Sequence, residues 1–235
     1  MDGVPLHSSQ WRGGGAQRIP RPQRWGYGGL APWVDRARSL LVADVVGALA
    51  SRHEIDRRAP IDSLRESAVL VALVDGPDGA EVLLTRRSQT LASHRGEISF
   101  PGGRIDAGET FEAAALREAH EEVALDPSVA RLRGRLEPIS TIASRSYIVP
   151  VVATLDRRPT LQPAVDEVDR IMWVPLAELT RSDTFREELW HLDGASRPIY
   201  FFELDDETVW GATARILHQL LRVALGIDGP EPPAL

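Results

Sequence analysis

The chain has 235 residues and a mass of 25.9 kDa, a length suited to one large domain with extensions. With 43% hydrophobic and 26% charged residues, the composition is that of a globular protein and excludes collagen-like, disordered and disulfide-scaffold classes. No cysteine occurs, so disulfides, thiolate metal sites and cysteine nucleophiles are excluded too. The net charge of −7 disfavours a nucleic-acid partner. Since we find no secretion signal and no membrane-spanning run, we expect a cytoplasmic protein without a membrane partner.

The N-terminal part has a composition unlike the rest. Residues 1–30 hold ten Gly or Pro, four Arg and one acidic residue, a charge of 4 − 1 = +3, which predicts a flexible basic arm. Residues 31–66 are expected to form a helical extension. Its amphipathic helix should run from Val34 to about Arg52, because apolar side chains recur there at helical spacing, at Ala37, Leu41, Val45 and Leu49.

Strand and helix signals alternate along the remaining chain, which predicts a mixed α/β domain at 67–226. Apolar runs at 68–74 and 82–85 flank turn residues 76–79 and predict a hairpin of buried strands. A Gly-rich loop at 101–103 leads into an Ala- and Glu-rich helix at 110–123. Other strands are expected at 97–100, 147–155, 170–174 and 198–203, a helical turn at 175–179, a closing helix at 209–225 and a flexible tail at 227–235.

The helix at 110–123 carries an unusual set of acidic residues. Residues three and four apart share a helix face, so Glu118 should project beside Glu121 and Glu122. Like charges packed together repel one another, and a divalent cation removes the conflict. Mg²⁺ binds few protein carboxylates and bridges to phosphates, so this cluster predicts a phosphate-bearing substrate. We also expect an ion pair between Arg117 and Glu109, which would hold the loop with the Gly102 carbonyl facing the metal.

The spacing of these residues resembles the Nudix box. In Gly103 to Leu125, a Gly is followed by five residues, Glu, seven residues, Arg-Glu, two residues and Glu-Glu. The resemblance implies an α/β/α sandwich with a mixed sheet, and hydrolysis of a nucleoside diphosphate derivative with Mg²⁺ or Mn²⁺. Ala124 departs from the family pattern, which usually has Gly there, suited to a left-handed helix end. We expect Ala to cost about 1 kcal/mol there or to shift the helix end.

Residues upstream of the box resemble coenzyme A diphosphatases. The pattern comprises 83–88, Leu91, His94 and 96–103, and the resemblance continues through 147–152, 166–168, 174–176 and 209–214. It implies cleavage of coenzyme A or its thioesters to 3′,5′-ADP and a 4′-phosphopantetheine product. The alternatives are another nucleoside diphosphate derivative, such as NADH, ADP-ribose or an oxidised dNTP, and a nucleotide-sensing module without hydrolysis.

The candidate site residues follow from these two patterns. Glu118 and Glu122 are the preferred metal ligands, while Glu121, or failing that Glu167, would position or deprotonate the water. Arginine suits phosphate recognition, so the substrate-binding candidates are the nearby cations Arg86, Arg87, Arg95 and Arg104, with His94. Structural or solvated roles remain open for each of these, and for Glu167. The partner is a small-molecule substrate, and a homodimer is left open.

Overall fold

The computed structural model describes residues 11–36, 39–51, 64–141 and 145–227. The main sheet has eight strands: β2 (Arg65–Gly76), β3 (Gly79–Arg87), β4 (Ile98–Ser99), β5 (Gly102–Arg104), β6 (Arg131–Arg135), β7 (Ile139–Thr141), β8 (Ser146–Thr154) and β9 (Val168–Pro175). Its order is β4–β3–β2–β8–β6, with β9 on β3, β5 on β2 and β7 on β8. The β2–β8 pair is parallel and β2–β3 antiparallel, so the sheet is mixed as expected.

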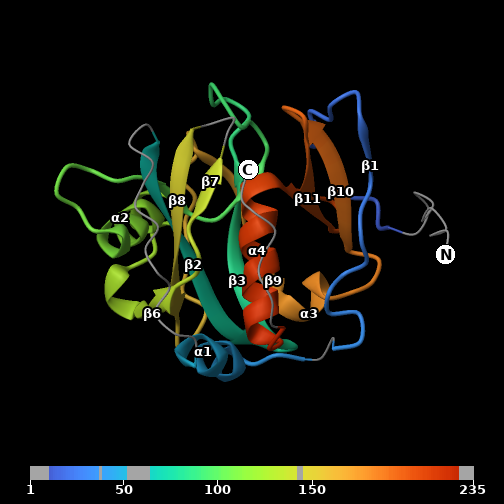
Figure 1. Ribbon diagram of the computed structural model, residues 1–235. Helices are drawn as coiled ribbons and strands as arrows, with labels where there is room; N and C mark the ends of the chain where they lie inside the picture. The colour runs from blue at the N-terminus through green and yellow to red at the C-terminus, as the bar shows by residue number, and fades with distance from the viewer. Residues whose placement is uncertain (1–10, 37–38, 52–63, 142–144, 228–235) are drawn as a thin grey trace.

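Helices cover both faces of this sheet (Figure 1). Successive side chains of β2 point to opposite faces. Leu70 and Ala72 therefore pack toward α2 (Phe111–Val123), whereas Val71 and Leu73 pack toward α1 (Val42–Ala50) and α4 (Gly211–Ala224). The expected α/β/α arrangement is thus confirmed. None of the helices in the described part of the chain is long and apolar enough to cross a membrane.

A second, antiparallel sheet packs on the far side of α4 (Figure 1). Its order is β1 (Trp25–Tyr27), β10 (Phe185–Leu192), β11 (Ala195–Glu203) and β12 (Thr208–Trp210). Phe185 and Phe202 from this sheet meet Trp33 and the buried face of α4 in one continuous core. The sequence predicted part of β11 but not β1, β10 or β12. A short helix α3 (Leu176–Leu179) and a 3₁₀ turn η2 (Pro127–Val129) complete the elements.

The N-terminal region differs from the expected flexible arm. β1 pairs with β10, and the Trp11 indole N–H donates to the Phe185 carbonyl at 3.0 Å. Residues 11–30 are therefore held by backbone and side-chain hydrogen bonds on the second sheet, which the Gly- and Pro-rich composition did not indicate. The helix begins at Val42 rather than near Val34. Residues 1–10, 37–38, 52–63 and 228–235, including Ala37, Arg52 and most of the expected tail, lie outside the described residues.

Candidate active site

The Gly-rich loop and the acidic helix are held against the same strand. β5 pairs with β2, with Gly102 opposite Val69, and α2 packs its alanines onto the same region of the sheet. The helix starts where the Thr110 hydroxyl accepts a hydrogen bond from the Ala113 amide at 3.2 Å. This N-cap satisfies one of the free amides of the first turn and so fixes the residue at which the helix begins. The glutamates near the end of α2 consequently lie beside the loop.

Glu122 is the most buried of these glutamates, with 3% of its surface exposed. Its Oε2 accepts a hydrogen bond from the Gly102 amide at 3.3 Å, and its Oε1 lies 3.9 Å from Arg87 Nη1. Burial raises the pKa of Glu122 to about 7; Arg87 and the Gly102 amide oppose the rise, and the charges of Glu118 and Glu167 add to it. A buried carboxylate with so little compensation favours a nearby cation.

Glu118 lies directly over the Gly-rich loop. A Cβ atom on Gly103 would collide with the Glu118 carboxyl group, so a larger residue at this position would displace that carboxylate from the loop. Burial also raises the pKa of Glu118, opposed by Arg117, whose Nη1 is 3.0 Å from Glu118 Oε1. The charges of Glu121 and Glu167 raise this pKa further, which places Glu167 within electrostatic range of both Glu118 and Glu122.

Arg117 ties the loop to the helix. The structure contains the expected ion pair, with Arg117 Nε 3.0 Å from Glu109 Oε1, and Nη2 donates to the Arg104 carbonyl at 2.9 Å. Arg117 also lowers the pKa of Glu109. One guanidinium thus holds the segment between β5 and α2 against the helix.

Glu121 is the most exposed of the three glutamates. Its side chain is 56% exposed and its Oε2 accepts a hydrogen bond from Arg117 Nη1 at 3.0 Å. The same Arg117 Nη1 is 3.0 Å from Glu118 Oε1, so one guanidinium nitrogen bridges Glu118 and the more exposed Glu121 across one helical turn. Among the described residues, no group of three or more His, Asp or Glu is already arranged around a common metal position.

The donor set nevertheless fits a divalent cation. Glu118 and Glu122 supply hard carboxylate oxygens, and their mutual repulsion together with that of Glu167 is relieved by a positive ion. Mg²⁺ is usually held by one or two carboxylates together with water and substrate phosphates, so a closed cage of protein ligands is not required.

Comparison with known proteins supports the same interpretation. The sequence matches the NUDIX domain over residues 64–193. It is 38% identical over 180 residues to Nudix hydrolase 22, chloroplastic, from Arabidopsis thaliana, covering 72% of this chain and 57% of that protein. It is 34% identical over 171 residues to the uncharacterized Nudix hydrolase NudL from Klebsiella pneumoniae (strain 342), covering 72% of this chain and 84% of that protein. The chain belongs to the NUDIX domain family.

These relatives are named hydrolases, and the chain is a Nudix hydrolase. It spans a little over half the length, 57%, of the Arabidopsis relative. Among solved structures, the Nudix hydrolase RenU from M. smegmatis has a TM-score of 0.43 and 26% identity, covering 49% of this chain and 73% of that one. Nudix hydrolases generally use divalent metal ions such as Mg²⁺.

The Nudix box ends at Ala124 in a left-handed backbone conformation, with φ 55° and ψ 31°. The Ala124 amide donates to the His120 carbonyl at 2.9 Å, so the helix ends at the position where the family usually has Gly. The helix end is therefore not shifted. The substitution leaves an alanine in a conformation that L-residues rarely adopt.

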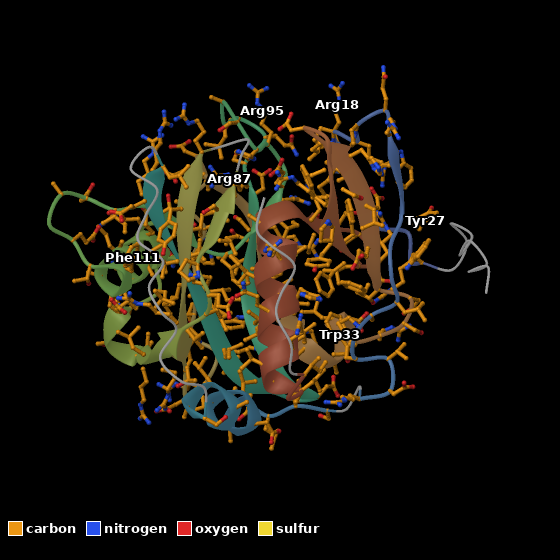
Figure 2. All side chains as sticks on the ribbon, viewed as in Figure 1. Arg18, Tyr27, Trp33, Arg87, Arg95 and Phe111 are labelled. Carbon is orange, nitrogen blue, oxygen red and sulfur yellow. The ribbon has the colours of Figure 1, made fainter. Side chains whose placement is uncertain are left out.

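The predicted substrate-binding cations occupy different surroundings. Arg87 faces Glu122, whereas Arg86 points to the opposite side of β3 and binds Glu207 at 2.9 Å. Arg95 projects at the same end of the molecule as Arg87 (Figure 2), and its Nε donates to the Leu91 carbonyl. His94 Nδ1 lies 2.9 Å from Glu97 Oε2. Arg104 is exposed at the loop.

Glu207 is a polar residue of this region that sequence reasoning missed. It is 1% exposed, and its Oε1 lies 2.9 Å from Arg86 and 3.0 Å from Arg170. In the sequence it ends the run Asp205-Asp206-Glu207, which is typical of a solvated turn. Its burial depends on how the second sheet meets β3, so no local signal could reveal it.

Proposed function

We propose that this Nudix hydrolase cleaves the diphosphate of coenzyme A or its thioesters to 3′,5′-ADP and 4′-phosphopantetheine or its acyl derivative, with Mg²⁺ or Mn²⁺. The observation that carries the proposal is the 3.9 Å approach of Arg87 to the buried Glu122. Arg87 ends β3 and begins the loop 88–97, whose residues resemble those of coenzyme A diphosphatases. A cation and a carboxylate pair beside this loop suit a diphosphate with a bound metal ion.

Glu118 and Glu122 would hold the metal ion, with the Gly102 carbonyl as a further oxygen from the loop. When bound, such an ion neutralises charge on the diphosphate and lowers the pKa of a coordinated water. Arg87 would bind a diphosphate oxygen through its guanidinium. Arg117 would position Glu118 and the loop, through its bonds to Glu118 and to the Arg104 carbonyl.

The reaction needs a base for the attacking water. Water would form a new P–O bond in line with the bridging oxygen, whose bond to phosphorus breaks, and the proton would pass to a carboxylate. Both Glu121 and Glu167 are exposed, but Glu121 is bonded to Arg117 and its charge acts on Glu118, whereas the charge of Glu167 acts on both Glu118 and Glu122. The structure therefore favours Glu167 over Glu121, the reverse of the order inferred from sequence. Glu167→Gln should lower kcat and remove the acidic limb of its pH profile, while Glu121→Gln should do neither.

The remaining candidates would recognise the rest of coenzyme A. Arg95, His94 and Arg104 lie on the exposed side of the site or its loops, where the 3′-phosphate could be bound by a cation. Arg86 is a weaker candidate because Glu207 already pairs with it. Its role would be to hold the loop rather than to contact phosphate.

A substrate panel tests the proposal. Purified protein is incubated with Mg²⁺ or Mn²⁺ and with coenzyme A, NADH, ADP-ribose or dNTPs, and the phosphorylated products are resolved. Preferential release of 3′,5′-ADP from coenzyme A is the expected result. Preferential cleavage of another panel member would retain the hydrolase and reject the substrate, and no cleavage of any member would favour a nucleotide sensor.

A further inference from the structure

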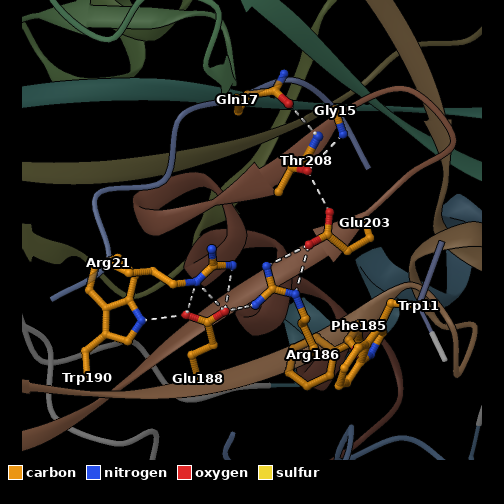
Figure 3. A network of polar contacts seen from close by, with 10 residues as sticks. All are labelled: Trp11, Gly15, Gln17, Arg21, Phe185, Arg186, Glu188, Trp190, Glu203 and Thr208. Carbon is orange, nitrogen blue, oxygen red and sulfur yellow. Dashed lines mark hydrogen bonds and ion pairs between the residues drawn. The ribbon is translucent and has the colours of Figure 1, made fainter. Parts of the chain in front are cut away.

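The N-terminal segment 11–28 makes three side-chain hydrogen bonds with the rest of the chain through Gln17. The Gln17 side-chain amide donates to the Gly96 carbonyl at 3.1 Å and to Glu207 Oε2 at 2.6 Å. Its oxygen accepts a hydrogen bond from the Thr208 amide at 2.9 Å, as Figure 3 shows. Because the amide nitrogen can only donate and the oxygen only accept, one orientation of the group satisfies all three bonds.

The backbone of this segment approaches the second sheet closely. The Gly15 amide donates to the Thr208 hydroxyl at 2.9 Å (Figure 3). A Cβ on Gly15 would lie 2.7 Å from the Glu207 Cα, so a larger residue would push the segment away. At Gly13 a Cβ would meet its nearest neighbour, the Asp205 carbonyl, at 3.7 Å, an ordinary contact.

Glu207 links Gln17 to the strand that carries Arg87. One carboxylate oxygen of Glu207 accepts from Gln17, and the other lies 2.9 Å from Arg86 Nη1 and 3.0 Å from Arg170 Nη1. Arg86 directly precedes Arg87 at the end of β3. A buried carboxylate shared by two guanidinium groups and an amide is a rigid junction, because each partner restricts the others.

The loop 88–97 lies between this junction and the proposed base. The Gly96 amide donates to the Arg87 carbonyl at 3.1 Å, closing the loop on itself, while the Gly96 carbonyl is held by Gln17. At its other end the Ser88 amide donates to the Glu167 carbonyl at 2.8 Å. The loop is therefore fixed on one side by the N-terminal segment and on the other by the residue whose charge acts on Glu118 and Glu122.

From these contacts we infer that Gln17 is a positioning residue through which the N-terminal segment holds the substrate-binding loop 88–97 in place for catalysis. The inference rests on the proposed function for the role of the loop. Residues 11–28 lie outside the matched NUDIX domain, at 64–193, so the segment would be an addition to the site rather than part of it. Loss of the Gln17 bonds should loosen the loop and weaken substrate binding while leaving the carboxylates intact.

The test compares two variants with two controls in the full chain. Gln17→Leu removes the three hydrogen bonds at nearly constant volume, and Gly15→Ala displaces the segment. Gln23→Leu changes an exposed glutamine of the same segment, and Gly13→Ala adds a methyl group where there is room. Hydrogen exchange of residues 87–97 and steady-state kinetics are measured for each.

Gln17→Leu and Gly15→Ala should speed exchange in the loop by roughly tenfold, which corresponds to about 1.4 kcal/mol. KM should rise several-fold with kcat within about twofold, and both controls should match the parent protein. Unchanged loop exchange in Gln17→Leu would overturn the inference. The inference would also be overturned if exchange became faster throughout the protein and both control variants showed altered kcat and KM.

The exchange readout separates this inference from the proposed function. If the parent protein does not cleave coenzyme A, the proposed substrate fails, and the kinetics are measured on whichever panel member is cleaved. If no member is cleaved, loop exchange alone decides whether Gln17 holds the loop.

Discussion

Replacing Ala124 by Gly should stabilise the protein without changing its activity. Ala124 has φ 55° and is exposed at the end of α2, so the substitution removes a methyl group that packs against little. A left-handed conformation costs an L-residue roughly 1–2 kcal/mol relative to glycine. Glycine gains additional freedom in the unfolded chain, worth about 0.4–1 kcal/mol in the opposite direction. The net gain in the free energy of unfolding should therefore be about 1 kcal/mol.

An alanine-to-glycine substitution near the start of the same helix serves as a matched control. Ala113 is exposed in the first turn of α2, where the backbone is right-handed. Its backbone amide donates the capping bond to the Thr110 hydroxyl, so the Ala113 side chain takes no part in it. Ala113→Gly should cost about 0.5–1 kcal/mol through helix propensity alone. The two variants should thus shift stability in opposite directions.

Thermal and urea unfolding measure both effects. For a chain of this size, about 1 kcal/mol corresponds to a change in Tm of roughly 2–4 °C. The urea slope should be equal among the three proteins, because no surface burial changes. A loss of stability in Ala124→Gly equal to that in Ala113→Gly would refute the reasoning, since it would show that Ala124 is not in the left-handed conformation.

Three further predictions concern the site and its loop. Glu122→Gln should leave the urea transition in place and lower turnover with Mg²⁺ by roughly 10²–10⁴-fold, because a metal-binding charge is lost; turnover like that of the parent would contradict the assignment. Arg117→Gln should lower the free energy of unfolding by about 1–2 kcal/mol, while Arg131→Gln, in an exposed pair, should change it by less than about 0.5 kcal/mol. The Glu97 hydrogen bond raises the pKa of His94, so this bond stabilises the fold below pH 6.5 and weakens as pH rises through the raised value. NMR titration should place the His94 pKa above 6.5 and return it toward 6.5 in Glu97→Gln; an unchanged value in that variant would exclude Glu97 as the cause.

Elements with strong local periodicity could be predicted from sequence. The hairpin of β2 and β3 follows from two apolar runs around the turn at 76–79, and α2 follows from its Ala- and Glu-rich composition after a Gly-rich loop. The Glu109–Arg117 pair follows as well, because the box spacing places Glu109 in the loop just before α2 and Arg117 on that helix. In each case the residues that decide the structure are close together in the chain.

Apart from a piece of β11, the second sheet could not be predicted, because its strands bury charge. β10 carries Arg186 and Glu188, which are 7% and 0% exposed, in the middle of a strand. Arg186 binds Glu203 of β11, and Arg21 from the N-terminal segment binds Glu188 at 2.9 Å (Figure 3). Such pairs disrupt the apolar alternation that identifies strands. A buried ion pair is formed only when all its partners are assembled, so no single stretch of sequence contains the signal.

The same distinction divides the candidate site. The contacts of Glu118 and Glu122 with Arg117 and the Gly-rich loop arise within 20 residues, from Gly102 to Glu122, and sequence spacing was sufficient to locate them, whereas Arg87 reaches Glu122 from β3. The junction at Glu207 joins Gln17, Arg86 and Arg170, which are separated from it by 190, 121 and 37 positions. Its geometry depends on the packing of the second sheet against β3 through the core around α4. Changes in the second sheet should therefore leave metal binding at Glu118 and Glu122 intact. They should instead disturb the placement of the loop 88–97 that binds substrate.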